Sequence, residues 1–161
     1  MYKRQPETRL RALFAAPADH YESPFEDAEA DRLIFSLDTI KILDPACGSG
    51  AYPMGALHRL VDLLRKLDPD NTRWVARQRV RLIAERQRID AQPDRELRKE
   101  LLADHARHEV ELAPLFDPAA GSFDRDYARK VFLIQNSIFG VDLQPIAVQI
   151  TKLRFFIALI C

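Results

Sequence analysis

Two short segments of the chain place an acidic side chain directly after an apolar run. The first, Ile42-Leu-Asp-Pro-Ala-Cys-Gly-Ser-Gly50, reaches Asp44 and continues into a Gly-x-Gly turn, and the second is Ile138-Phe-Gly-Val-Asp142. Because glycine has no Cβ, a ligand can lie directly against the main chain at Gly48 and Gly50. An apolar strand that ends in an acid and a glycine turn is typical of a cofactor site at the carboxyl end of a parallel sheet.

The residues around the turn narrow the class of ligand. A phosphate-binding loop contains Gly-Lys-Ser or Gly-Lys-Thr, and neither sequence occurs in the chain. A dinucleotide fingerprint would place its third glycine where the chain has Pro53. The turn therefore argues against ATP and NAD, and a nucleotide-dependent oxidoreductase stays only as an alternative.

The segment Asp44-Pro-Ala-Cys-Gly-Ser-Gly50 resembles the S-adenosylmethionine-binding motif of adenine-specific, amino-group DNA methyltransferases. Ile138-Phe-Gly-Val-Asp-Leu-Gln-Pro-Ile-Ala-Val148 is similar to the second motif of that family. The flanking segments Gly50-Ala-Tyr-Pro-Met-Gly-Ala-Leu-His-Arg-Leu60 and Ile150-Thr-Lys-Leu-Arg-Phe-Phe156 look most like the large enzymes of type IIG restriction-modification and BREX-type phage-defence systems. Tyr52 departs from that pattern, since it stands where a phenylalanine is expected.

The resemblance implies a role for each matched residue. Asp44 would lie near the methionine end of S-adenosylmethionine, with the backbone of Ala46–Gly50 beneath the cofactor. Asp142 would bind the ribose hydroxyls, and Leu143 would pack against the adenine. The residues expected to bind the cofactor are Asp44, Pro45, Ala46, Cys47, Gly48, Ser49, Gly50, Asp142 and Leu143.

Charge supports the same cofactor without reference to the family. S-adenosylmethionine is cationic at its sulfur and its amino group, and Asp44 and Asp142 frame a turn that lacks Lys and Arg. The alternative is structural: the two strands merely end in Asp, as strands often do.

The acceptor side of a methyltransferase has no counterpart in this sequence. In the family, an Asn/Asp-Pro-Pro-Tyr/Phe segment holds the target adenine, and the chain contains no such segment. It also has no Pro-Cys dipeptide, which excludes Cys47 as the nucleophile of cytosine-carbon methylation. The adenine amino nitrogen needs no such nucleophile, because it attacks the methyl group itself once the base is flipped out and positioned. No catalytic residue is assigned.

Apolar periodicity and turn residues predict the elements that carry these motifs. Residues 1–24 contain three prolines and predict an irregular arm with one short helix near Glu7–Phe14. The expected helices are Glu26–Leu37, Met54–Leu67, Thr72–Gln87, Asp94–Leu112, Asp124–Gln135 and Ile146–Ile160, and the expected strands are Ile40–Leu43 and Ser137–Asp142.

These elements predict an α/β fold, and the resemblance implies that it is an incomplete, Rossmann-like methyltransferase fold consisting of the first two parallel strands and their helices. Residues 1–37 are expected to form an N-terminal arm and lead-in helix. Residues 38–161, which the resemblance covers, are expected to form the partial methyltransferase domain. The stretch from about 70 to 136 is far longer than a usual helix-to-strand connection. It is therefore expected to be a helical insertion built around a hairpin of two helices.

Three other features invite a functional interpretation. Asp117-Pro-Ala-Ala-Gly-Ser-Phe123 copies the start of the glycine motif, but no apolar run precedes it, so it is expected to be a loop. His105 and His108 have a spacing that a metal could use, yet they lack a third ligand and are expected on a solvated helix face; no metal site is predicted. Six arginines crowd the segment Thr72–Gln87 and its end, and they suit DNA phosphates or pairing with the acidic residues of the next helix equally well.

Composition sets the broad class. The chain has 161 residues, 30% of them charged, and a formal net charge of zero, so it lacks the positive excess of a nucleic-acid-coating protein. Two widely separated cysteines, no secretion signal and no apolar run of about 20 residues predict a cytoplasmic protein that neither crosses nor enters a membrane. The apolar segment Phe155–Cys161 closes without a helix cap, which predicts that it is either buried in something larger or prone to aggregation.

The sequence thus predicts the cofactor-binding part of a site-specific DNA adenine methyltransferase, which meets DNA through the complete enzyme and is expected to be inactive alone. The alternative is a non-catalytic S-adenosylmethionine-binding half of a split enzyme, or an interaction module, whose sheet is completed by a second polypeptide.

Overall fold

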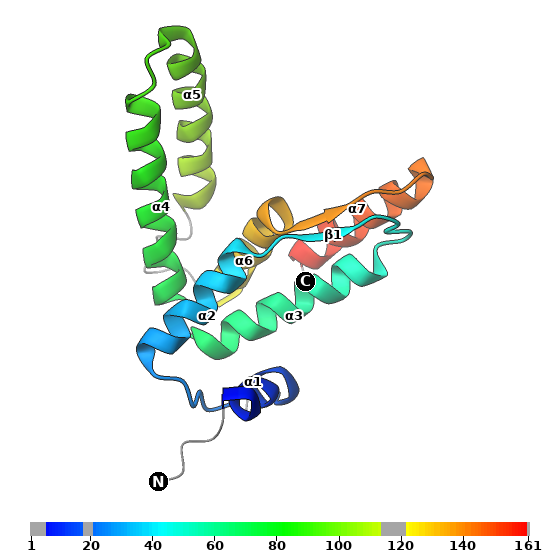
Figure 1. The fold of residues 1–161 in the computed structure, drawn as a ribbon. Helices are drawn as coiled ribbons and strands as arrows, with labels where there is room; N and C mark the ends of the chain where they lie inside the picture. Colours follow the sequence, from blue (N-terminus) through cyan, green and yellow to red (C-terminus); the bar gives the residue numbers. More distant parts are fainter. Residues whose placement is uncertain (1–5, 18–20, 114–121, 161) are drawn as a thin grey trace. The chain divides into compact units, whose positions relative to one another are not determined.

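The computed structural model describes residues 6–17, 21–113 and 122–160 (Figure 1). The elements in chain order are α1 (Pro6–Ala15), α2 (Asp27–Thr39), β1 (Ile42–Asp44), α3 (Ala51–Leu67), α4 (Thr72–Asp90), α5 (Arg95–Leu112), α6 (Ser122–Asn136), β2 (Ile138–Gly140) and α7 (Pro145–Ile160). Within the described residues, β1 and β2 form one parallel two-stranded sheet. The predicted α/β class with a parallel sheet is confirmed at this coarse level.

The chain divides into two compact units. The first comprises Met1–Asp70 together with Arg129–Cys161 and contains the sheet, and the second comprises Asn71–Ala128 and contains α4 and α5.

Both strands are shorter than the sequence predicts. Ile40 belongs to the end of α2 and not to β1, because its N–H donates to the carbonyl of Ser36 at 3.0 Å. Ser137 likewise belongs to the end of α6, since its N–H donates to the carbonyl of Leu133 at 2.9 Å. The helical hydrogen-bond pattern therefore persists up to each strand, and β1 begins two residues later than expected.

The core of the first unit is organised by α3. This helix has a continuous apolar face that it buries against α2 and both strands. Its fully buried residues include Leu57, Leu63 and Leu64, and Ile34 of α2 and Ile138 of β2 are buried as well. Each buried leucine contributes roughly 1.5–3 kcal/mol relative to an exposed one. The packing of α3 thus fixes the position of the turn that precedes it.

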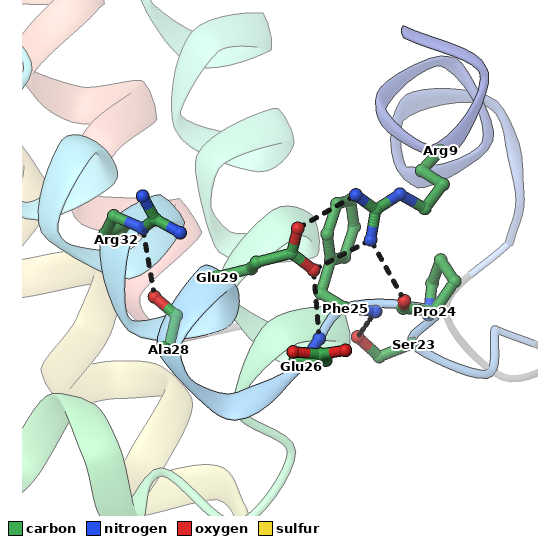
Figure 2. Close-up of polar contacts among 8 residues, drawn as sticks. All are labelled: Arg9, Ser23, Pro24, Phe25, Glu26, Ala28, Glu29 and Arg32. Atoms are coloured by element: carbon green, nitrogen blue, oxygen red, sulfur yellow. Dashed lines mark hydrogen bonds and ion pairs between the residues drawn. The ribbon is translucent and has the colours of Figure 1, made fainter. Parts of the chain in front are cut away.

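The short N-terminal helix α1 is tied to α2 by a bidentate ion pair (Figure 2). The Arg9 guanidinium donates to both carboxylate oxygens of Glu29 at 2.7 and 2.8 Å and also lies over the Phe25 ring. The Glu29 carboxylate additionally accepts from the N–H of Glu26, which completes a capping box at the start of α2. The Arg9 hydrogen bonds, followed by that of Glu26, lower the pKa of Glu29 from 4.5 to about 2.

The other end of α1 is capped from α3. Lys66, whose side chain is fully buried, donates to the carbonyl of Leu13 at 3.0 Å and pairs with Asp62 at 2.6 Å. Arg59 donates to the carbonyl of Phe14 at 2.9 Å. Because α1 has no basic residue in its own last turn, these cations supply the interaction that a helix C-terminus favours. The predicted arm is therefore anchored to the first unit by polar contacts at both ends of its helix.

Within the second unit, α4 and α5 pack against each other as a helical hairpin, as the sequence predicts (Figure 1). Trp74, Gln78 and Leu82 of α4 are buried, and Asp94 caps α5 by accepting from the N–H groups of Glu96 and Leu97 at 2.9 and 3.1 Å. None of the helices described is both long enough and apolar enough to cross a membrane.

Candidate functional site

Parallel pairing brings the two predicted motifs to one edge of the sheet. Asp44 is opposite Gly140 in the register, so both chains leave their strands at the same level. The pairing continues past the strands: the Val141 N–H donates to the Asp44 carbonyl and the Cys47 N–H donates to the Val141 carbonyl, each at 3.0 Å. The exit of β2 is thus bonded directly to the turn that follows β1.

Asp142 makes the most specific contact between the motifs. Its Oδ2 atom accepts the N–H of Gly48 at 2.8 Å, although the two residues are 94 positions apart in the chain. Its Oδ1 atom accepts the N–H of Gln144 at 2.8 Å. The hydrogen bonds from Gln144 and Gly48 lower the pKa of Asp142, so the side chain is a carboxylate at neutral pH. The structure therefore brings the second acid into contact with the glycine turn.

The turn is compact and held by its own backbone. The Asp44 side chain accepts the N–H of Ala46 at 3.1 Å, and the Gly50 N–H donates to the Cys47 carbonyl at 2.8 Å. Gly48 and Gly50 have φ angles of 52° and 80°, in the left-handed region that favours glycine. A single turn between β1 and α3 therefore requires both glycines for its backbone shape.

The two glycines differ in what surrounds them. A Cβ on Gly48 would meet no atom within 4 Å, so this side of the turn is open. A Cβ on Gly50 would lie 2.8 Å from the Thr151 side chain of α7. Only Gly48 therefore fits the expectation that a ligand approaches the main chain, whereas Gly50 allows the approach of a neighbouring helix. Gly140 has a similar packing role, because its Cβ would lie 3.1 Å from that of Cys47.

Two residues of the flanking segment Ile150–Phe156, neither of them among the expected cofactor-binding residues, also contact the turn. Thr151 Oγ1 donates to the Gly48 carbonyl at 3.0 Å, and the Arg154 guanidinium donates to the Ser49 carbonyl at 2.9 Å. The turn itself contains no Lys or Arg, as the sequence shows. In the folded chain, however, α7 places the Arg154 side chain against the turn. Thr151 and Arg154 are three positions apart, so they lie on the same face of α7. This spacing does not show what the face packs against, so the two contacts could not be predicted from the sequence.

The remaining predicted residues lie on the surface of the turn and of the β2 exit. Pro45, Ala46 and Ser49 are exposed, whereas Cys47 is buried. Leu143 is 100% exposed, which is unusual for a large apolar side chain. The arrangement offers an open backbone turn, an ionised carboxylate and an apolar side chain at one sheet edge.

The histidines are placed differently from the expectation. His105 is only 2% exposed, and its Nε2 atom lies 3.1 Å from the Leu82 carbonyl within the hairpin. The predicted solvated face is therefore wrong for His105. His108 Nδ1 lies 3.8 Å from the Glu85 carboxylate across the hairpin. In the described part of the chain, no three His, Cys, Asp or Glu side chains gather as metal ligands.

Two further predictions concern the insertion. Of the motif-like segment 117–123, residues 117–121 lie outside the described residues, and Ser122 and Phe123 begin α6. On α4, Arg86 pairs with Asp90 of its own helix at 3.1 Å. This ion pair is exposed to solvent and lies within one helix, so it gives no support for binding to DNA.

No family model matches the chain, and neither the curated proteins nor the solved structures contain a significant match to it.

Proposed function

We propose that the chain binds S-adenosylmethionine and supplies the methyl-donor side of a site-specific DNA adenine methyltransferase. The supporting observation is the 2.8 Å hydrogen bond from the Gly48 N–H to Asp142, because it joins the two segments that resemble the family's cofactor motifs. If the two strands merely ended in Asp by coincidence, no contact between Asp142 and the glycine turn would be expected.

The residues at the sheet edge fit the cofactor. Each carboxylate oxygen of Asp142 accepts one backbone N–H, and a carboxylate oxygen has two lone pairs, so capacity remains for the ribose hydroxyls. The open side of Gly48 allows close approach of a ligand to the main chain. The fully exposed Leu143 offers an apolar surface for the adenine. In this proposal Asp44 lies near the methionine end.

Methyl transfer to adenine divides into a donor side and an acceptor side. S-adenosylmethionine supplies an electrophilic methyl group, and the amino nitrogen of a flipped-out adenine attacks it without a covalent enzyme intermediate. Asp142 and the Asp44–Gly50 turn orient the donor. The given sequence has no Asn-Pro-Pro-Tyr segment, so the proposal assigns donor binding to these residues and DNA binding to the complete enzyme.

A second candidate is a non-catalytic cofactor-binding half that joins another polypeptide. It is favoured by apolar side chains that the first unit leaves exposed. Leu43 and Phe139 are direct cross-strand neighbours on the sheet and both are exposed. A stripe on α7 is exposed as well, and it consists of Ile146, Ile150, Leu153, Ile157 and Ile160.

Titration calorimetry with S-adenosylmethionine tests the proposal. We expect the wild-type protein to bind and Asp142→Ala to bind about 10- to 100-fold more weakly, because hydrogen bonds to a charged group contribute about 1.5–3 kcal/mol. Glu22→Ala, which removes an exposed acid elsewhere, should bind like the wild type. Binding of NAD without binding of S-adenosylmethionine would contradict both candidates.

A methylation assay separates the two candidates. The protein alone should transfer no labelled methyl group to DNA. If a second polypeptide restores transfer, the donor-side assignment stands, and if a complex with that polypeptide binds the cofactor but never methylates DNA, the non-catalytic candidate stands.

A further inference from the structure

We infer that Thr151 and Arg154 of α7 are positioning residues for the glycine turn. Both lie in the flanking segment Ile150–Phe156, and neither is among the residues expected to bind the cofactor. Both donate a side-chain hydrogen bond to a turn carbonyl: Thr151 to Gly48 at 3.0 Å and Arg154 to Ser49 at 2.9 Å. Consecutive peptide groups of the turn are therefore each held by the same helix.

Peptide geometry gives these bonds a directional consequence. The Gly48 carbonyl and the Ser49 N–H belong to one planar trans peptide group, in which they point in opposite directions. A Gly48 carbonyl that is held toward Thr151 therefore directs the Ser49 N–H away from α7. The turn also has open space beside Gly48, where a Cβ would meet no atom within 4 Å.

The packing of Thr151 adds a steric constraint to the hydrogen bond. Thr151 is buried, and both its methyl carbon and its hydroxyl would lie 2.8 Å from a Cβ on Gly50. The residue thus touches Gly50 with its branched end while its hydroxyl holds Gly48. A glycine turn is intrinsically adaptable, so a helix that fixes two successive carbonyls reduces the ordering that a ligand must impose. The ligand's identity rests on the proposed function, but the two hydrogen bonds do not.

Two substitutions of Thr151 separate positioning from packing. Thr151→Val keeps the branched shape and removes the hydroxyl, and Thr151→Ser keeps the hydroxyl and removes the methyl group. If Thr151 positions the turn, the valine variant should bind S-adenosylmethionine roughly tenfold more weakly, equivalent to about 1.4 kcal/mol, and the serine variant should bind like the wild type. A purely packing role predicts the reverse order and would overturn the inference.

Arg154→Gln offers an independent variant at an exposed position, with Lys152→Gln as the matched loss of a cation on the same helix. We expect weaker binding only for the Arg154 variant, and equal affinities for the two variants would contradict its role.

The amide NMR signals of Ser49 and Gly50 make the inference testable without ligand. Both should shift in Thr151→Val and Arg154→Gln, and neither should shift in Lys152→Gln. Thr151→Ser removes the methyl group beside Gly50, so it should leave the Ser49 signal unchanged and shift only that of Gly50. If the wild type binds no S-adenosylmethionine while these signals follow that order, the proposed function fails and the positioning role stands. If the wild type binds the cofactor but the NMR signals and affinities of the Thr151, Arg154 and Lys152 variants do not follow the expected order, the positioning role alone fails.

Discussion

At the scale of single residues, the proposed cofactor site depends on the contact between Asp142 and Gly48. The sequence marks both of them, because an acid that ends an apolar run and a glycine that follows one are local patterns. Their contact is not local: it depends on a register that pairs Asp44 with Gly140 across more than 90 positions. The same limit explains why Thr151 escaped prediction. A threonine inside an amphipathic helix looks ordinary until the fold places it against the turn.

Gly48 and Gly55 provide a matched test of backbone conformation. Gly48→Ala should lower the free energy of unfolding by about 1–2 kcal/mol, because its φ of 52° is unfavourable for a residue with a Cβ. Gly55→Ala should raise the free energy of unfolding by up to about 1 kcal/mol, because Gly55 lies exposed within α3 and alanine favours the helix. Urea unfolding measures both. A Gly48→Ala variant that is as stable as the wild type, or more stable, would contradict the left-handed conformation of Gly48.

At the scale of elements, periodicity predicts helices better than strands. The helices from α2 to α7 end within a few residues of the expected positions, since each has an apolar face that repeats over several turns. The strands have three residues each, too few for an alternating pattern, and their limits depend on where the preceding helices end. The anchoring of α1 could not be predicted, because Arg9, Arg59 and Lys66 reach partners that are distant in sequence.

The ion pair between Arg9 and Glu29 predicts a pH-dependent attachment of α1. Glu29 has a pKa of about 2 in the folded protein and an ordinary value of 4.5. Its contribution to the free energy of unfolding is therefore complete above pH 4.5 and is lost as the pH falls toward 2. Glu29→Gln should therefore be less stable than the wild type at pH 7, and the difference should shrink between pH 4.5 and 2. Urea unfolding followed by circular dichroism measures this difference.

Glu7→Gln is the control for that experiment. It removes the exposed partner of Arg11 on α1, an i, i+4 pair of the kind that contributes about 0.3–0.5 kcal/mol. If Glu29→Gln costs no more stability than Glu7→Gln at pH 7, the ion pair does not anchor α1.

The hairpin depends on the cap of α5. Asp94→Ala should destabilise the hairpin by about 1 kcal/mol, because the side chain accepts two N–H groups at the start of the helix, whereas Asp94→Asn should preserve most of the stability. Trp74 is the only tryptophan and is buried in this unit, so its fluorescence reports unfolding of the hairpin. Asp90→Ala, at an exposed acid on α4, is the comparison. An equal loss of stability in Asp90→Ala and Asp94→Ala would argue against the cap.

At the scale of the whole molecule, the structure has features that suit a larger assembly. The first unit leaves the cross-strand pair Leu43 and Phe139 exposed, together with the apolar stripe on α7. Large exposed apolar surfaces mark interaction sites in soluble proteins. The formal net charge of zero gives the chain no overall positive excess for nucleic acid. Under the proposed function, contact with DNA therefore belongs to the complete enzyme. Composition gives no information about which apolar side chains stay exposed, because exposure depends on how the helices and strands pack.

The central claim is that one sheet edge binds S-adenosylmethionine, and amide NMR spectra recorded during titration with the cofactor test it most directly. We expect the largest changes in amide chemical shift at residues 44–50 and 142–144, and we expect Asp142→Ala to suppress these changes at the same cofactor concentration. Unchanged signals in both segments of the wild-type protein, or shifts confined to the hairpin unit, would contradict it.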